Sequence, residues 1–537
     1  FPEMHKESFL AKTDINSTFT SACFNVILQM CSRLLTFSVN AIILRYINSS
    51  VLGIINVRLL LLYSTISFIS HEPFRKAGLR TKNFSETKVV NVLWLSVPWT
   101  GVVSLLFGFL WIYILENPGD QLLFQYRFTV CCIVVSCLLE ALCEPLLIFC
   151  QALHLLKVKI VAESFLVLTR TVLFGVSVFL KNEYAVMGFG ISQVISSCIF
   201  LSIYVIYMAK WCYSKSTSLR SFSPVWCSGE VFDHETYRLT WSFLQQSVLK
   251  QTLTEGERYI MSVFQVLTFS QQGVYDVVSN LGSLAARFIL APVEEASYLY
   301  FSQALREANK QTSNHEVQLF LTTLMNILLY FGIVVCVYSL SYSRLLLHLY
   351  GGELLSEGEG PALLKGQSVY VVFLALNGIL EAFVFAAMSQ QDVKRFDFLH
   401  KLNLKSTIPR YNHKMLLLSV LLLVSTLVLT RVFGSLGFIV ANSLNMGVRI
   451  IHSICYINNM YKNQVSPLLN VCLDYKILLY LSTTAVMLIY SELKLFEQLK
   501  LYHFMVGSVS FIVTVGYISI KEGHLLKNFN TLRKKAS

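Results

Sequence analysis

The sequence predicts an all-α protein that crosses a membrane many times, and three observations carry this prediction. Of the 537 residues, 55% are hydrophobic and only 14% are charged, whereas soluble domains carry roughly a quarter charged residues. Apolar stretches long enough to cross a bilayer recur from about residue 19 to residue 520. Lys and Arg gather in alternate loops between these stretches, a bias that marks the cytosolic side of membrane proteins. The composition therefore excludes a soluble globular fold.

The apolar stretches divide into fourteen predicted helical spans. They lie near residues 19–43, 51–70, 89–114, 126–150, 158–180, 184–209, 238–264, 270–300, 317–341, 365–389, 414–432, 435–458, 473–492 and 500–520. The seventh and eighth spans carry the most charge, but removing either would scramble the alternation of Lys and Arg in every later loop. The same alternation predicts that both termini lie in the cytosol.

Features of the first six spans recur in spans seven to twelve. Gln29 and Arg33 in span one match Gln246 and Lys250 in span seven, about 220 residues later. Such matches indicate two six-span bundles, and an even number of spans per repeat makes the bundles parallel and pseudo-symmetric around a central cleft. The alternative is chance similarity among apolar helices.

The chain accordingly divides into six parts. We expect a cytosolic segment over 1–18, an N-terminal six-helix bundle over 19–209, a cytosolic loop over 210–237, a second six-helix bundle over 238–458 with a cytosolic insertion at 396–410, two additional transmembrane helices over 473–520 and a basic cytosolic tail over 521–537.

Ionisable residues inside membrane spans are costly, so each is a candidate for function. Arg33, Arg58, Lys250 and Arg287 lie in corresponding spans of the two halves and would line both walls of a central cleft. A cationic cleft favours an anionic substrate, and the planar fork of arginine suits phosphate oxygens. The sequence therefore predicts a binding site for a phosphate-containing ligand.

The alternative is that these charges form structural ion pairs, for instance Glu257 with Arg258. Among the acids, Glu140 and Glu144 lie one turn apart just before Pro145. We expect them to form a packed polar patch at a helix kink rather than an acid/base pair.

Several function classes fit poorly. The sequence has no Walker motif, no paired CxxC and no nucleic-acid-binding motif, so we expect no cofactor, no metal and no nucleic-acid partner. The net charge of +12 instead concerns topology and contact with anionic membrane lipids. A membrane glycosyltransferase needs an exposed loop carboxylate, and the first non-cytosolic loop, residues 46–50, has none. Because that carboxylate is missing, we expect no enzyme. A cation-coupled exporter also fits poorly, because it would place acids in the cleft where this chain places arginines.

Several motifs together resemble the eukaryotic RFT family, the endoplasmic-reticulum branch of the multidrug/oligosaccharidyl-lipid/polysaccharide flippase superfamily. These are K-Q-T-L-T-E-G-E-R-Y from Lys250, Q-G-V-Y-D-V-V-S-N-L-G-S-L-A-A-R ending at Arg287, P-V-E-E from Pro292 and A-N-S-L-N-M-G-V-R-I from Ala441. The match runs from about residue 32 to residue 462.

The resemblance implies a multi-pass protein of the endoplasmic-reticulum membrane that acts in N-glycosylation. Its implied substrate is the lipid-linked oligosaccharide Man5GlcNAc2-PP-dolichol, moved from the cytosolic to the lumenal leaflet without ATP hydrolysis. On this reading, the side chains that contact the diphosphate are Arg33, Arg45, Arg58, Lys250, Arg258 and Arg287. Glu257 would orient one of these arginines, and Arg449 would line the cytosolic mouth. The alternative is a non-transporting accessory factor that binds the same lipid.

The chain departs from the family pattern at two places. The stretch 396–410 has no counterpart in that pattern, and His71 stands where relatives tend to carry Arg. The contribution of residue 71 to binding is therefore in question.

Overall fold

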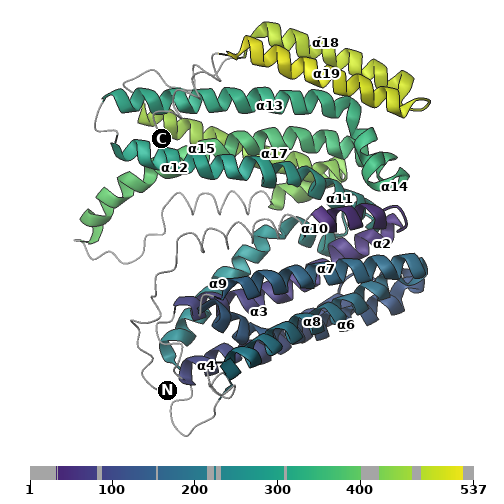
Figure 1. Cartoon of the computed structure of the whole chain (residues 1–537), viewed down its shortest axis with the longest axis vertical. Coiled ribbons are helices and arrows are strands. Elements are labelled where there is room, and N and C mark those ends of the chain that lie inside the picture. Colours follow the sequence, from purple (N-terminus) through teal and green to yellow (C-terminus); the bar gives the residue numbers. More distant parts are fainter. Residues whose placement is uncertain are drawn as a thin grey trace. The chain divides into compact units, whose positions relative to one another are not determined.

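The computed structural model describes residues 34–80, 87–152, 155–214, 232–307, 311–400, 423–461 and 473–523, together with residue 32 and residues 223–224. These residues form helices joined by short turns, with no strand among them (Figure 1). The chain divides into two compact units, unit 1 (Phe1–Gln265) and unit 2 (Val266–Ser537). The all-α prediction is confirmed.

Eleven helices in the described part of the chain are long and apolar enough to cross a membrane. They correspond to eleven of the predicted spans, the second to sixth, eighth to tenth and twelfth to fourteenth. Two shorter apolar helices, Leu34–Ile43 and Leu423–Phe433, belong to predicted spans whose remaining residues lie outside the described ranges. The predicted span 238–264 is helical but is not among the eleven. The count of fourteen therefore stays a prediction.

Unit 1 is built around the long helix α6. Its elements are α2 (Ser49–Gly53), η1 (Ile54–Leu59), α3 (Leu60–Arg80), α4 (Thr87–Trp94), α5 (Ser96–Tyr113), α6 (Gly119–Ala152), α7 (Leu156–Leu180), η2 (Asn182–Tyr184), α8 (Ala185–Ser214), α9 (His234–Thr254) and α10 (Gly256–Phe264). Helices α3, α5 and α8 pack along α6. Gly190 of α8 permits a close approach to α6, because a Cβ atom there would lie 3.1 Å from the Cα atom of Thr129. Nearby, the Thr129 hydroxyl donates to the Val186 carbonyl at 2.9 Å.

Within unit 1, helix α3 packs against α5, α6 and α9. Helix α9 begins where the Asp233 carboxylate accepts a hydrogen bond from the Thr236 amide at 2.8 Å, which satisfies one of the free donors at a helix start. The boundary between the units follows Gln265, so α9 and α10 lie in unit 1. The sequence repeat assigns the same segment to the second bundle, and the repeat-based division stays a prediction.

Unit 2 is built around the long helix α15. Its elements are α11 (Phe269–Ala285), η4 (Ala286–Leu290), α12 (Ala291–Glu307), α13 (Gln311–Gly351), α14 (Glu353–Ser356), α15 (Gly360–His400), the apolar helix Leu423–Phe433, α17 (Leu436–Met460), α18 (Tyr475–Leu495) and α19 (Lys500–Lys521). Helices α11, α12, α13 and α17 pack against α15. The core includes Phe301 and Phe383, whose ring centroids lie 5.2 Å apart. Helices α18 and α19, drawn in yellow in Figure 1, pack beside α13.

Each unit contains a π-helical segment next to a candidate site residue. Segment η1 joins α2 to α3 and includes Arg58, and segment η4 joins α11 to α12 and includes Arg287. Such wide turns inside α-helices occur frequently at functional sites. The helices that carry the predicted intramembrane arginines are therefore locally irregular at those arginines.

Candidate functional site

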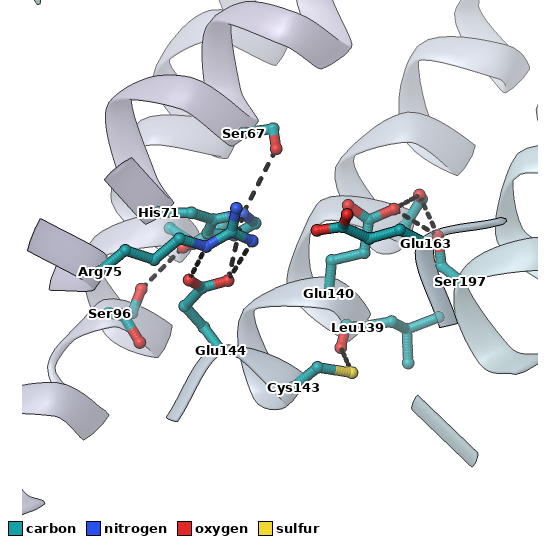
Figure 2. A network of polar contacts seen from close by, with 12 residues as sticks. Ser67, His71, Arg75, Ser96, Leu139, Glu140, Cys143, Glu144, Glu163 and Ser197 are labelled. Carbon is teal, nitrogen blue, oxygen red and sulfur yellow. Dashed lines mark hydrogen bonds and ion pairs between the residues drawn. The ribbon is translucent and has the colours of Figure 1, made fainter. Parts of the chain in front are cut away.

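The face of α3 that meets α6 is lined with polar side chains at every fourth position. Tyr63, Ser67, His71 and Arg75 follow this spacing, which stacks them along one side of a helix. The facing helix, α6, carries Glu140 and Glu144, which lie one turn apart (Figure 2). The result is a polar network buried between apolar helices.

One half of this network is an arginine–carboxylate pair. Arg75 Nε donates to Glu144 Oε1, and Arg75 Nη2 donates to Glu144 Oε2 at 2.9 Å. His71 adds a contact, with its Nδ1 atom 3.8 Å from Glu144 Oε2, and Ser67 Oγ lies 3.3 Å from the same ring nitrogen. The Glu144 side chain is only 2% exposed. Two parallel hydrogen bonds to a charged group are strong and directional, so this pair fixes α3 against α6.

In the other half of the network, neutral hydroxyl groups donate hydrogen bonds to Glu140. The Tyr63 hydroxyl donates to Glu140 Oε2 at 2.8 Å, and the Ser197 hydroxyl donates to Oε1 at 2.7 Å. Ser136 Oγ lies 2.7 Å from Ser197 Oγ and 3.5 Å from Glu140 Oε1. Helices α3, α6 and α8 therefore meet at one carboxyl group.

On its other side, α3 contacts α9 through a cluster of charges. Glu72 lies 3.0 Å from Lys76 Nζ and 4.0 Å from Lys250 Nζ. Lys250 Nζ also lies 5.2 Å from the centroid of the Phe68 ring. The Lys250 side chain is 58% exposed, so its ion pair adds little stability and its ammonium group is open to a ligand.

Unit 2 contains a second arginine–carboxylate pair. Arg449 of α17 donates to Glu381 of α15 through Nε and Nη2, both at 2.8 Å. Glu294 of α12 packs against the same helix at Gly378, where a Cβ atom would lie 2.8 Å from Glu294 Oε2. Three helices therefore meet at charged groups here as well.

Arg58 is the most deeply buried of the predicted site residues whose side chains the structure describes. Its side chain is 1% exposed, and its Nη2 atom lies 3.8 Å from Glu116 Oε2. The Trp111 indole donates to the Arg58 carbonyl at 3.0 Å, and the Tyr126 hydroxyl donates to the Trp111 carbonyl at 3.3 Å. In this arrangement the Arg58 guanidinium is shielded from water.

The other predicted residues differ in exposure. Arg45 is exposed, and Glu257 and Arg258 are half-buried. Arg258 Nη1 donates to Glu255 Oε2 at 3.0 Å, so this acid orients Arg258; the expectation that Glu257 orients an arginine stays a prediction. Arg33 and the side chain of Arg287 lie outside the described part of the structure, as do residues 401–410 of the predicted insertion.

Reasoning from the sequence missed the Arg75–Glu144 pair. Arg75 lies beyond residue 70, the predicted end of span two, whereas α3 continues to Arg80. The signal that could have found the pair is Glu144 itself, since an acid inside a membrane span needs a partner. Within the residues described, no group of three or more His, Cys, Asp or Glu side chains is arranged to hold a metal ion.

Comparison with known proteins gives consistent matches. The family model described as "Rft protein" matches residues 17–532. A Xenopus tropicalis protein named "Man(5)GlcNAc(2)-PP-dolichol translocation protein RFT1" is 36% identical over 94% of both chains, and the mouse protein of the same name is 36% identical over 95% of both chains. Among solved structures, a lipid II flippase MurJ in an inward closed conformation matches with a TM-score of 0.57 at 12% identity, covering 94% of this chain and 100% of its own. The last match concerns the fold alone.

Proposed function

This chain belongs to the Rft protein family, and we propose that it moves Man5GlcNAc2-PP-dolichol from the cytosolic to the lumenal leaflet of the endoplasmic-reticulum membrane. The observation that carries the proposal is the likeness, over nearly the whole of both chains, to relatives named for translocating that lipid. The protein then acts as a transporter rather than an enzyme, with both termini in the cytosol.

The physical task fits the charges of the chain. A diphosphate and its sugars cannot enter hydrocarbon unaided, because burying unpaired charge costs many kcal/mol. Cationic side chains inside the membrane offset that cost, while the dolichol tail stays in lipid. Net transport needs no ATP if lumenal reactions consume the product.

The proposed diphosphate ligands are those expected from the sequence, and they differ in readiness. Lys250 is exposed and would meet the substrate first. Arg58 is buried and would reach it only after unit 1 rearranges around η1. Arg449 is held by Glu381, so substrate would compete with that carboxylate at the cytosolic mouth. Arg33, Arg45, Arg258 and Arg287 complete the set, with Glu257 as an orienting acid.

Reconstitution of the purified full chain in liposomes tests the proposal. We expect the oligosaccharide head group of the lipid to become accessible from the opposite side, at a rate that falls at least tenfold in the double variant Arg33→Ala plus Arg287→Ala. Arg344→Ala is the matched control, because Arg344 pairs only loosely, at 3.9 Å, with the exposed Glu497 and lies outside the proposed site.

The same assay separates transport from assistance. An accessory factor would bind the lipid without moving it, so retained binding and no translocation by the purified wild type would overturn the proposal. Wild-type rates in the double variant would remove the proposed site.

A further inference from the structure

Glu140 and Glu144, whose carboxyl groups lie one turn apart on α6, have hydrogen-bond partners of different charge. Glu144 is matched by the guanidinium of Arg75. Glu140 is 5% exposed, and in the described residues no cationic nitrogen lies within ion-pair distance of it. Its hydrogen-bond partners are the hydroxyls of Tyr63, Ser136 and Ser197. An ionised carboxylate is costly in such a place, since neutral donors offset only part of the desolvation.

The charged and titratable groups around Glu140 are known from every helix packed against it. Helix α3 brings Tyr63, His71 and Arg75, and the last two contact Glu144. Helix α6 itself adds Cys137, Cys143 and Glu144.

Helix α7 contributes Glu163, which Figure 2 draws with this network, and Arg170, which lies 5.7 Å from the centroid of the Tyr63 ring and donates to Gln193 Oε1 at 3.3 Å. Helix α8 contributes Ser197 and Gln193, and the titratable residue of α5 is Tyr113 at its far end. The direct contacts of Arg170 are therefore with Tyr63 and Gln193, and its charge, like that of Arg75, acts on the Glu140 carboxylate only through space.

The oxygen spacing favours a proton over a metal ion at this place. The Glu140 oxygens lie 2.7 and 2.8 Å from the hydroxyls of Ser197 and Tyr63. A small metal ion bound at about 2.0–2.6 Å keeps neighbouring oxygens about 2.9 Å or more apart. Oxygens already in hydrogen-bond contact leave no gap for such an ion, whereas a proton adds to one of them directly.

The hydroxyls can adapt to that proton. In the Ser136–Ser197 contact of 2.7 Å either hydroxyl can donate, and Gln193 Nε2 donates to Ser136 at 3.1 Å. When a proton from the aqueous phase forms an O–H bond on Glu140 Oε1, Ser197 turns from donor to acceptor and donates nothing to the carboxyl. All groups then remain hydrogen-bonded.

We propose that Glu140 is a proton-binding site whose protonation loosens the junction of α3, α6 and α8 during transport. The transport part rests on the proposed function. Hydrogen bonds to an ionised carboxylate are roughly twice as strong as those to a neutral one, so proton uptake weakens the bond from Tyr63 and replaces the bond from Ser197 with one from the neutral carboxyl group to the Ser197 hydroxyl. Helices α3 and α8 are then freer to move against α6, while the Arg75–Glu144 pair still links α3 to α6.

Infrared spectroscopy of the full chain in lipid tests proton binding without any need for transport. On titration with acid, we expect a carboxyl C=O band that is absent in Glu140→Gln and kept in Glu163→Gln, a matched acid on α7 that lies 3.9 Å from Lys159. Ser197→Ala and Tyr63→Phe remove donors to the ionised form, so the midpoint of the band moves to higher pH by about one to two units. These two variants keep the carboxyl group and carry the test if Glu140→Gln does not fold.

Two results would overturn the proton site: persistence of the band in Glu140→Gln, or an unmoved midpoint in both hydroxyl variants. The translocation assay tests the coupling. A wild-type rate that changes severalfold across the midpoint, and a Glu140→Gln rate that does not, is the expected result; a wild-type rate independent of pH overturns the coupling. Absence of translocation at every pH overturns the proposed function instead, while the infrared band still decides the proton site.

Discussion

The two units place a buried glutamate in the fourth span of each predicted half, but they neutralise it from different sides. In unit 1, Glu144 of α6 is bound by Arg75 of α3. In unit 2, Glu381 of α15 is bound by Arg449 of α17. Both pairs use Nε and Nη2 of the arginine, so the local geometry is the same. The helix that supplies the cation is not.

This difference indicates that the central acid, rather than the ion pair, is the shared feature. A buried carboxylate needs a partner, and any neighbouring helix that can supply an arginine satisfies the need. The unit 1 pair joins α3 to α6, and we assign it a structural role. The unit 2 pair holds an arginine of the proposed binding site.

The largest expected effect is the loss of the unit 1 arginine. Arg75→Met leaves the Glu144 charge, 2% exposed, without its partner, and should lower the free energy of unfolding by about 3–5 kcal/mol. Adding Glu144→Leu removes the stranded charge and should restore most of that stability. Denaturant titration of the reconstituted protein measures both.

Lys76→Met is the control for this pair. Lys76 contacts Glu72 from a side chain that is 38% exposed, so its loss should cost at most about 1 kcal/mol. An equal cost for Arg75→Met and Lys76→Met would show that the buried pair does not hold α3 in place.

The unit 2 pair should show a smaller stability effect and a larger functional one. Arg449→Met should cost about 2–4 kcal/mol, because Glu381 is 8% exposed and is better hydrated than Glu144. The double variant Arg449→Met plus Glu381→Leu should recover stability without recovering translocation, whereas the unit 1 double variant should recover both. Equal recovery of translocation in the two double variants would remove Arg449 from the proposed site.

The smallest expected effect concerns the helix starts of the two units. The hydrogen bond from Thr236 lowers the pKa of Asp233 from its ordinary value, so this cap stabilises the protein above the unfolded-state pKa and is lost as the pH falls through the folded-state pKa. Asp233→Ala should cost about 1 kcal/mol near neutral pH and less in acid.

Thr268, which caps α11 with Gln271 in a reciprocal capping box, is the uncharged comparison. Thr268→Ala should cost about the same at both pH values. Unfolding measured at neutral and acidic pH checks both caps, and a pH-independent cost at Asp233 would contradict the charged cap.

The spans were predictable because a bilayer demands apolar residues over a fixed length, and that demand is local in sequence. Helix α9 shows the limit of this rule. Lys250 and Gln251 lie on α9, and Glu255 follows its end. This helix is therefore too polar to be among the eleven helices that could cross a membrane. Its packing on α3, through contacts such as the 3.4 Å hydrogen bond from Gln251 Nε2 to Ser64 Oγ, depends on side chains far apart in the chain.

The site was predictable only as a list of charges. Because burying an ion costs free energy, Glu144, Glu381 and Arg449 are each expected to have a partner. Which residue that partner is depends on which helices are in contact. Arg75 forms the ion pair with Glu144 from a position that hydropathy assigns to a loop. Arg58 was expected at a cleft wall and is enclosed beneath Trp111 and beside Glu116, which no pattern in its own span could reveal.

The π-helical segment η1 keeps α2 and α3 in rotational phase while it holds one extra residue. A π-helical turn contains about one residue more than an α-helical turn, and one residue corresponds to about 100° around a regular helix. Deleting one residue from η1 would therefore leave an ordinary α-helical turn, and the α3 face that carries Tyr63 and Arg75 would keep its phase. A deletion within α3 would instead rotate the residues on one side of it by about 100° relative to those on the other. In family alignments, single-residue gaps should therefore fall at Ile54–Leu59 rather than within α3, where they would change the partners of Glu140 and Glu144.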